Sequence, residues 1–389
     1  MKLPAVDCFE KAESLLHATA SATAEGLTDF GDQSYLTGLR VLLRALDRDM
    51  HFCDGGRENA FGVMLQALVA RLYTERGWKD YPEAKQLALN KPLVITGIPR
   101  SGTTALHRLL AVDPQFQGLN HWLTTSPLPR PPLSSWSANP HYQASEMALA
   151  QWQQLVPAMK QQHLVQVGEV DECLEVLMQD FVSNRFGATL AVPSYDAWWR
   201  KQSELPSYRR FTDTLRLIGS NDPEKTWLLK NPGHTWGARE LLAVLPDACV
   251  VQTHRNPVEA IPSTASTMYT ARVVFEGAAA DASALGQREA QLWRDSLDRM
   301  SESRARTPER FHDVRFADFV ADPLRIIRSI YDRFGFELTD ETEARMQQWV
   351  QDHPRHEHGR HEFTAEQFGL TERGLRCQYR DYIEQFDLG

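Results

Sequence analysis

The chain has 389 residues, 42% of them hydrophobic and 24% charged, which is the composition of an ordinary globular protein with a large core. A net charge of -9 excludes a general nucleic-acid-binding protein, because such proteins carry a positive balance that contacts phosphates. No uncharged run approaches the roughly 18 residues of a membrane span, and Asp7, Glu10 and Glu13 interrupt the apolar core that a secretory signal requires.

The cysteines are odd in number and scattered, and none of them forms a CxxC pair that would indicate a redox or zinc site: Cys8, Cys53, Cys173, Cys249 and Cys377. This usage suits a reducing compartment, so we expect a cytoplasmic protein.

Residues 1–88 are predicted to form a helical N-terminal segment. Its clearest helix places apolar residues three and four positions apart, on one face: Phe61, Met64, Leu65, Leu68, Val69 and Leu72. From residue 89 the pattern changes to short apolar runs, each followed by a polar loop and a helical stretch. The runs are LVIT at 93–96, WLL at 227–229 and CVV at 249–251.

Alternation of this kind indicates parallel strands joined by crossover helices. We therefore predict an α/β fold, with a central parallel sheet flanked by helices over residues 89–340 and a C-terminal helical or lid segment over 341–389. The stretch SPLPRPPL at 126–133 is predicted to be an extended loop near the first anion site described below.

Two helices carry capping signals. Asn256 precedes Pro257 and Glu259 in the reciprocal capping pattern, and we expect Pro262 to disturb that helix within its first two turns. A second helix is predicted between Asp322 and a closing glycine, with these residues on one face: Ile326, Ile327, Ile330, Tyr331 and Phe334, followed by Gly335.

The stretch TGIPRSGTT has the glycine spacing of a phosphate loop, from Gly97 to Gly102, at a strand-to-helix turn. A nucleotidase loop has Lys next, whereas this chain has Thr103 and Thr104 and carries its cation at Arg100. Without that Lys, and without a clear strand ending in Asp to hold Mg²⁺, the parts of ATP hydrolysis are incomplete. The loop indicates a site for a metal-free anhydride; the alternatives are a turn without a ligand and a surface ion pair at Arg100.

The motif PRSGTT resembles the 5'-phosphosulfate loop of sulfotransferases that use 3'-phosphoadenosine 5'-phosphosulfate (PAPS). A second signature of that family, an Arg after a strand and a Ser eight positions later, matches Arg255 and Ser263 in VVQTHRNPVEAIPSTAS. Taken alone, that second match could be a capped helix with an exposed Arg. The likeness also includes WLLKNPGH, RFADFVADPLRIIRSIYDRFG and EQFGL, so it covers roughly residues 90–389 and is closest to the bacterial type.

This resemblance implies a P-loop-like three-layer fold and transfer of a sulfuryl group from PAPS to a hydroxyl of a small-molecule acceptor, without metal. It implies that Ser101 and the three residues after it, Gly102, Thr103 and Thr104, cradle the 5'-phosphate. Arg100 would stabilise the negative charge that develops as the anhydride bond breaks, and Arg255 and Ser263 would bind the 3'-phosphate. The rival interpretations are a Mg²⁺-dependent P-loop kinase and a non-catalytic nucleotide-binding protein.

A general base must take the proton of the acceptor hydroxyl, and His suits neutral pH. The resemblance implies a catalytic His between the two phosphate motifs. His163 is the first candidate, with Glu172 as its partner or as the base, and His121 is the rival. Lys230, after the strand WLL, is expected at the carboxyl edge of the sheet, where it would stabilise the sulfuryl group or orient the loop; the alternative is a surface Lys. His234 could reach the same edge.

The polar tail has the spacing of a metal site, but Pro354 and Gly359 break the helix that would align the ligands, so a basic lid is the favoured interpretation. The residues concerned are His353, His356, His358 and His361, with Arg355 and Arg360. A helix containing Tyr379, Tyr382 and Phe386 is predicted to follow. Tryptophans at 122, 136, 152, 198 and 199 indicate either an aromatic or apolar acceptor or simply core packing.

Overall fold

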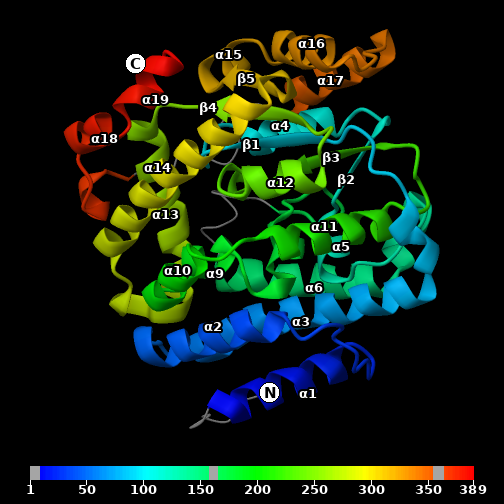
Figure 1. The fold of residues 1–389 in the computed structure, drawn as a ribbon, viewed down its shortest axis with the longest axis vertical. Coiled ribbons are helices and arrows are strands. Elements are labelled where there is room, and N and C mark those ends of the chain that lie inside the picture. Colours follow the sequence, from blue (N-terminus) through cyan, green and yellow to red (C-terminus); the bar gives the residue numbers. More distant parts are fainter. Residues whose placement is uncertain (1–8, 157–164, 354–362) are drawn as a thin grey trace.

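A five-stranded, entirely parallel sheet organises the chain in this computed structural model, which describes residues 9–156, 165–353 and 363–389 (Figure 1). The strand order is β2-β3-β1-β4-β5, with β1 Leu93–Gly97, β2 Phe116–Gly118, β3 Thr226–Lys230, β4 Cys249–His254 and β5 Phe311–Arg315. The three predicted apolar runs are the central strands β1, β3 and β4. The edge strands escaped prediction because β2 has only three residues and β5 carries polar residues, FHDVR.

Successive residues of the central strands bury opposite faces of the sheet, so a helical layer covers each face. Leu93, Ile95 and Val251 pack against α4 (Thr103–Leu110), α16 (Pro323–Phe334) and α17 (Asp340–Asp352). Val94 and Val250 pack toward the opposite layer, which contains α5 (His121–Thr125), α8 (Leu174–Leu177), α11 (Leu205–Ile218) and α12 (Ala238–Val244). The predicted α/β architecture, helix layers around a parallel sheet, is confirmed.

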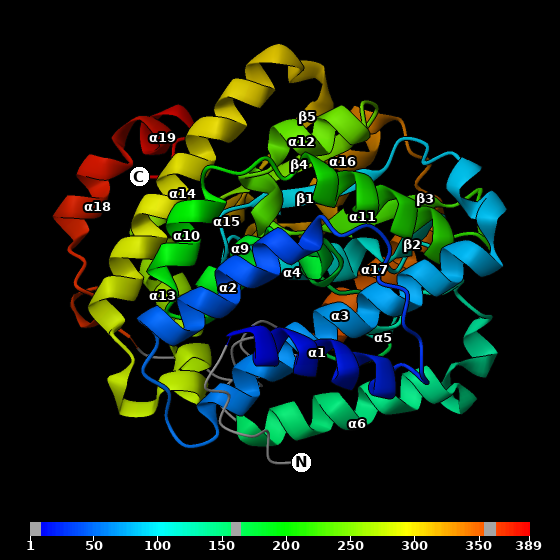
Figure 2. The same cartoon turned by 60° about the horizontal axis from the view of Figure 1, so that its bottom comes forward.

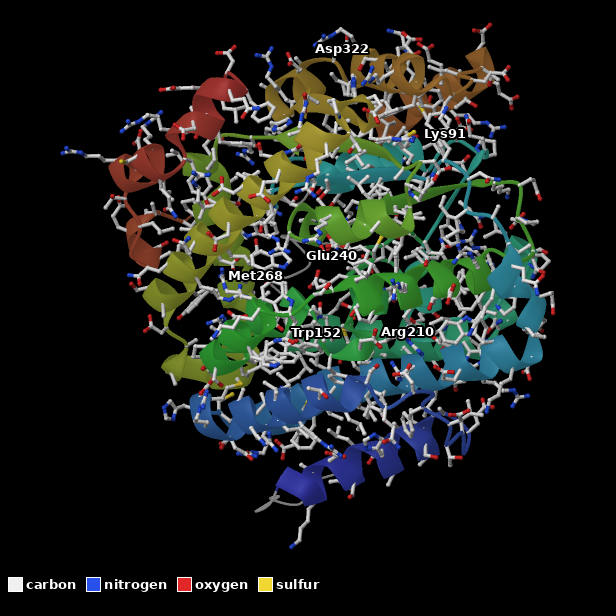
Figure 3. The ribbon with its side chains drawn as sticks, viewed as in Figure 1. Lys91, Trp152, Arg210, Glu240, Met268 and Asp322 are labelled. Carbon is white, nitrogen blue, oxygen red and sulfur yellow. The ribbon has the colours of Figure 1, made fainter. Side chains whose placement is uncertain are left out.

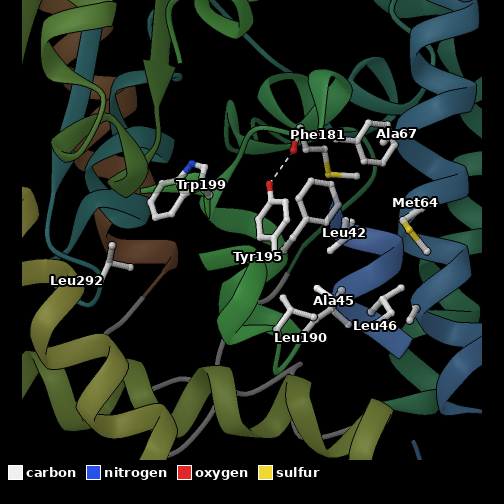
Figure 4. Close-up of a cluster of buried hydrophobic side chains, with 14 of the residues drawn as sticks. Leu42, Ala45, Leu46, Met64, Ala67, Phe181, Leu190, Tyr195, Trp199 and Leu292 are labelled. Atoms are coloured by element: carbon white, nitrogen blue, oxygen red, sulfur yellow. Dashed lines mark hydrogen bonds between the residues drawn. The ribbon is translucent and has the colours of Figure 1, made fainter. Parts of the chain in front are cut away.

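The N-terminal segment is helical, as predicted: α1 (Phe9–Thr23), α2 (Tyr35–Asp49) and α3 (Gly56–Asp80). Figure 2 shows α1 lying across α3. These helices share one hydrophobic cluster with α9 (Asn184–Thr189), α10 (Pro193–Trp199), α13 (Pro257–Glu276) and α14 (Ala282–Arg306). Leu42, Leu46 and Met64 belong to the same cluster as Leu190 and Tyr195, whose hydroxyl donates to the Phe181 carbonyl at 2.7 Å (Figure 4). The boundaries at 88 and 340 stay a prediction.

The predicted caps at Asn256 and Asp322 are confirmed, whereas Glu259, the expected reciprocal partner of Asn256, pairs with Arg255. The Asn256 side chain accepts from Val258 N, but α13 continues through Pro262, so the expected disturbance was wrong. Pro262 has no backbone N–H and so leaves one helical hydrogen bond unmade, but α13 continues because the residues around Pro262 are buried and packed. Asp322 caps α16 and Gly335 closes it with a left-handed backbone.

The remaining elements surround these layers. Residues 126–132 form the predicted irregular loop, which leads into η2 (Leu133–Ala138) and α6 (Pro140–Leu155). The tail contains two short helices, α18 (Glu372–Gln378) and α19 (Arg380–Gln385), where one was expected. The other short elements are η1 (Pro82–Gln86), η3 (Met178–Asp180), η4 (Pro232–Thr235), η5 (Gly277–Ala279), η6 (Pro308–Arg310), α15 (Phe316–Ala321) and η7 (Glu366–Phe368).

A buried ionic network joins the N-terminal helices to the rest of the protein. Arg71 of α3 is fully buried; it donates to Asp180 at 2.6 Å and to the Phe30 carbonyl at 2.6 Å. Arg210 of α11, labelled in Figure 3, pairs with Glu75 of α3 at 2.7 Å. Buried charges of this kind are tolerated only when each has its partner.

We expect Arg71→Leu to lower the free energy of unfolding by about 3–5 kcal/mol, because it leaves the Asp180 carboxylate buried without its cation. The control is Arg40→Leu, which removes the solvent-exposed pair with Glu13 and should cost less than about 1 kcal/mol. Urea denaturation measures both. Equal costs for the two variants would contradict the network's role.

Candidate active site

The candidate site lies where four strands end. Gly97 ends β1, Lys230 ends β3, His254 ends β4 and Arg315 ends β5, and these strands are neighbours in the sheet. In open parallel sheets, ligands bind beyond this carboxyl edge. Because all strands run parallel, both predicted phosphate motifs and Lys230 lie at this one edge of the sheet.

The loop between β1 and α4 has a backbone that only particular residues allow. Gly97 has a φ of 137°, and a Cβ there would lie 2.3 Å from the Thr253 carbonyl oxygen of the neighbouring strand. Gly102 has a φ of 90° immediately before α4 begins at Thr103. The unpaired N–H groups of this helix start and its partial positive charge favour an anion. This turn is the strand-loop-helix geometry that the spacing predicted.

Ser101 has a different use within this loop. Its side chain is 1% exposed, donates to the Ile98 carbonyl at 2.5 Å and lies 2.6 Å from the Thr253 hydroxyl. These two bonds hold the loop against β4. The Ser101 hydroxyl therefore supports the loop from the sheet, while Thr103 is buried and the Thr104 hydroxyl accepts from Lys230.

The two phosphate motifs contact each other directly. Arg100 Nε donates to the Ser263 hydroxyl at 3.1 Å, and Arg255 Nη1 donates to the Arg100 carbonyl at 2.8 Å. Arg100 adopts a φ of 67°, a left-handed conformation that costs a non-glycine residue free energy and often marks a functional site. Two arginines from motifs 155 positions apart thus form one positive patch.

The electrostatics of this patch suit an anion. The protein atoms packed around the Arg100 guanidinium, and next the positive charge of Arg255, lower the pKa of Arg100, although much of the residue is exposed. Arg255, just before α13, also pairs at 2.9 Å with Glu259 in the first turn of that helix, an exposed pair of small energetic value. Like charges held close together are stabilised by a ligand of opposite charge.

Lys230 is buried at the carboxyl end of β3. Its side chain is 1% exposed, and its Nζ donates to Glu172 at 2.6 Å and, more weakly, to the Thr104 hydroxyl at 3.4 Å. The alternative of a surface lysine is therefore wrong. Lys230 connects the phosphate loop to the segment 169–172, and Glu172 supplies its counter-ion.

His121 and Asp171 form a second polar pair beside this lysine. His121 Nδ1 lies 2.7 Å from Asp171 Oδ2, and both side chains are largely buried. Burial alone lowers the pKa of His121, but the hydrogen bond and charge of Asp171 outweigh it, so the pKa is raised. Asp171 also lines a small pocket that opens to solvent, together with Thr104, Arg108, Val165, Gln166, Val170 and Lys230.

The other predicted histidines have different positions. His163 lies outside the described residues, as do His356, His358 and His361. His234 is fully buried, and its Nδ1 lies 2.8 Å from the Tyr208 hydroxyl; burial lowers its pKa to about 3. It is a neutral core residue, shielded completely from solvent. His353 stacks on Trp349.

Several other expectations concern the described residues. No group of three or more His, Cys, Asp or Glu side chains in the described ranges is arranged to hold a metal. Within those ranges, no helix is long and apolar enough to cross a membrane. Trp122 and Trp199 are buried in hydrophobic clusters, which is the core interpretation of the tryptophans.

The end of β4 is fixed by residues that the sequence did not reveal as partners. His254 lies directly before Arg255 and is fully buried, with Nδ1 2.8 Å from the Tyr382 hydroxyl and Nε2 2.9 Å from Asp313. The Phe386 ring stacks on the His254 ring, with 3.8 Å between the two ring centres. Burial lowers the pKa of His254 although its ring donates a hydrogen bond to the Asp313 carboxylate, which favours the charged form. Thr253 and Phe316, which contact the loop, were also missed, and their only signal is a place at or beside a strand end.

A parallel sheet that carries a phosphate-type loop, a second basic motif and a buried lysine at one edge defines an anion-binding α/β protein of the group-transfer kind. The sulfotransferase family model matches residues 92–340, and the chain belongs to this family. Its activity is accordingly that of a sulfuryl transferase, and the bacterial type of the family is confirmed by its relatives.

Related mycobacterial sulfotransferases match this chain in structure and in sequence. The sulfotransferase STF1 of Mycobacterium tuberculosis is 35% identical, with a TM-score of 0.86 over 95% of this chain and 98% of that one. STF9 of Mycobacterium avium is 25% identical, with a TM-score of 0.88 over 100% and 99%. The omega-hydroxy-beta-dihydromenaquinone-9 sulfotransferase Stf3 of Mycobacterium bovis is 24% identical over 309 residues, 74% of each chain. The likeness therefore includes the N-terminal helices, which the sequence motifs did not reach.

We expect Asp171→Asn to lower the pKa of His121 from above its ordinary value near 6.5 to below it, because burial remains while the hydrogen-bonding carboxylate is lost. NMR titration of ¹³C-labelled histidine, assigned with His121→Gln, measures this change. An unchanged pKa would contradict the pairing.

The same pair predicts a pH dependence of stability. Since the folded-state pKa of His121 exceeds the unfolded one, its charged pair with Asp171 stabilises the fold below the unfolded pKa, and this contribution disappears as pH rises through the folded pKa. The difference in free energy of unfolding between the wild-type protein and Asp171→Asn should shrink accordingly.

Proposed function

We propose that the protein transfers a sulfuryl group from PAPS to a hydroxyl of a small-molecule acceptor and releases adenosine 3',5'-bisphosphate. The observation that carries this proposal is the contact of Arg100 with Ser263 and of Arg255 with the Arg100 carbonyl. It joins two basic motifs from different strands into one patch, and a nucleotide with phosphates on both sides of its ribose has the charge distribution that such a patch suits. Family membership favours sulfuryl transfer over the kinase alternative.

The residues present fit such a nucleotide. The loop from Gly97 to Thr104 offers backbone N–H groups, two threonine hydroxyls and a helix start for the 5'-phosphate, and side chains larger than glycine would crowd positions 97 and 102. Arg255 and Ser263 would hold the 3'-phosphate. PAPS supplies the activated sulfuryl group, and the protein orients it and stabilises charge.

Lys230 and Arg100 would stabilise the negative charge that develops as the sulfur–oxygen bond breaks. Lys230 Nζ lies within hydrogen-bond distance of Thr104 and Glu172, so its position is fixed before any ligand arrives. A cation held in place away from water needs little reorganisation during reaction, which is why such groups contribute most to catalysis. Glu172 serves in this proposal as the counter-ion of Lys230.

The general base is proposed to be His121, oriented by Asp171. With Nδ1 bound to the carboxylate, Nε2 has no hydrogen-bond partner among the described residues and can take the acceptor's proton. The acceptor oxygen then bonds to sulfur while the bond from sulfur to the phosphate oxygen breaks, and the nucleotide leaves with its electron pair. His163, the first candidate from the sequence, is the alternative base, and the experiment below separates the two.

The acceptor is proposed to be a small molecule with a free hydroxyl. Support comes from the name of Stf3, which describes a hydroxylated menaquinone derivative as the substrate of that relative. The cytoplasmic location expected from the cysteine pattern stays a proposal.

We expect Arg255→Ala to weaken binding of adenosine 3',5'-bisphosphate about 10- to 100-fold, since it removes charge-assisted hydrogen bonds worth about 1.5–3 kcal/mol. Binding of AMP, which lacks the 3'-phosphate, should change little. Isothermal titration calorimetry measures both. If the wild-type protein ignored the bisphosphate and bound ATP with Mg²⁺, the kinase alternative would replace the proposal.

His121→Ala should lower turnover about 100- to 10,000-fold while leaving bisphosphate binding unchanged, as expected for loss of a general base. His163→Ala is the matched comparison, and steady-state kinetics with a hydroxyl acceptor found by library screening gives the readout. Full activity of His121→Ala with an inactive His163→Ala would transfer the role to His163. No turnover of any hydroxyl compound by the wild-type protein would favour the non-catalytic alternative.

A further inference from the structure

One aromatic ring contacts both phosphate motifs. Phe316 is the first residue of α15 and follows Arg315, the last residue of β5. The Arg255 guanidinium carbon lies 4.5 Å from the centre of the Phe316 ring. A Cβ at Gly102 would lie 3.0 Å from Phe316 Cδ2, so the same ring also packs against the phosphate loop. Phe316 thus lies between the start of α4 and the arginine of the second motif.

Arg255 needs such support. A long arginine side chain loses much conformational freedom when it is fixed. Arg255 lies just before α13, and the first turn of that helix offers it a contact with Glu259, whose side chain is 62% exposed. Among the described residues, its other side-chain contacts are the Arg100 carbonyl and the Phe316 ring. A flat ring beneath a guanidinium attracts it electrostatically and leaves its N–H groups free to bind oxygen atoms at the edge.

We infer that Phe316 is a positioning residue that holds Arg255 for the 3'-phosphate and so gives the enzyme its preference for 3'-phosphorylated adenosine nucleotides. This inference rests on the proposed function. It assigns the preference to a residue at the end of β5, outside both phosphate motifs.

The test compares dissociation constants for adenosine 3',5'-bisphosphate and AMP by calorimetry. Phe316→Leu should reduce the preference for the bisphosphate about three- to thirtyfold, because it keeps an apolar side chain but removes the ring face. Phe316→Tyr, which keeps the ring, should retain the wild-type preference. Phe52→Leu is the control, since the Phe52 ring pairs with Arg57 at 5.0 Å in another part of the molecule.

The inference is supported if Phe316→Leu reduces the preference for the bisphosphate in the otherwise wild-type protein but has no such effect in the Arg255→Ala variant. An unchanged preference overturns it, and so does an equal loss for both nucleotides, which would mean that the ring serves the loop or the adenosine instead. If Phe316→Leu does not fold, Phe316→Met replaces it. A wild-type protein that binds AMP as tightly as the bisphosphate would overturn the proposed function itself.

Discussion

The contact between Arg255 and the carbonyl of Arg100 is the interaction on which the candidate site depends. A residue with an ordinary backbone at position 100 would point its carbonyl elsewhere, and the two basic motifs would remain separate anion sites. The left-handed conformation of Arg100 turns this carbonyl toward β4 and its own side chain toward Ser263. Local backbone strain is thus exchanged for one continuous patch, and the surrounding sheet is rigid enough to maintain it.

Beside this patch, two adjacent carboxylates each bind a different side chain. Glu172 neutralises the buried Lys230, whereas Asp171 orients His121. Two consecutive residues thus contact two different partners, so a single short stretch fixes both the lysine and the histidine. The backbone of this stretch is itself fixed, since Asp171 N donates to the Leu119 carbonyl and Cys173 N to that of Lys230.

Much of the fold was predictable because its signals are local. The apolar runs of β1, β3 and β4, the caps of α13 and α16 and the glycines of the loop each depend on a few consecutive residues. The edge strands lack such a run, and α13 tolerates Pro262 because tertiary packing outweighs one lost hydrogen bond.

The candidate site was predictable only where a motif carries it. Arg100, Arg255, Ser263 and Lys230 gather at one edge because each lies at or beside a strand end or on the helix that follows it. The pairing of His121 with Asp171 spans 50 positions, and the contact of Phe316 with Arg255 spans two strands. Neither has a sequence signal, because pairs of this kind arise from how the loops fold over the sheet.

The contacts of His254 decide which part of the chain supports the strand end before Arg255. Tyr382 and Phe386, in and just after α19, clamp the residue that precedes Arg255. In Figure 1 the label for this end of the chain lies far from that for the amino end. A bulky group placed directly after α19 would therefore lie close to the contacts that fix the strand end before Arg255.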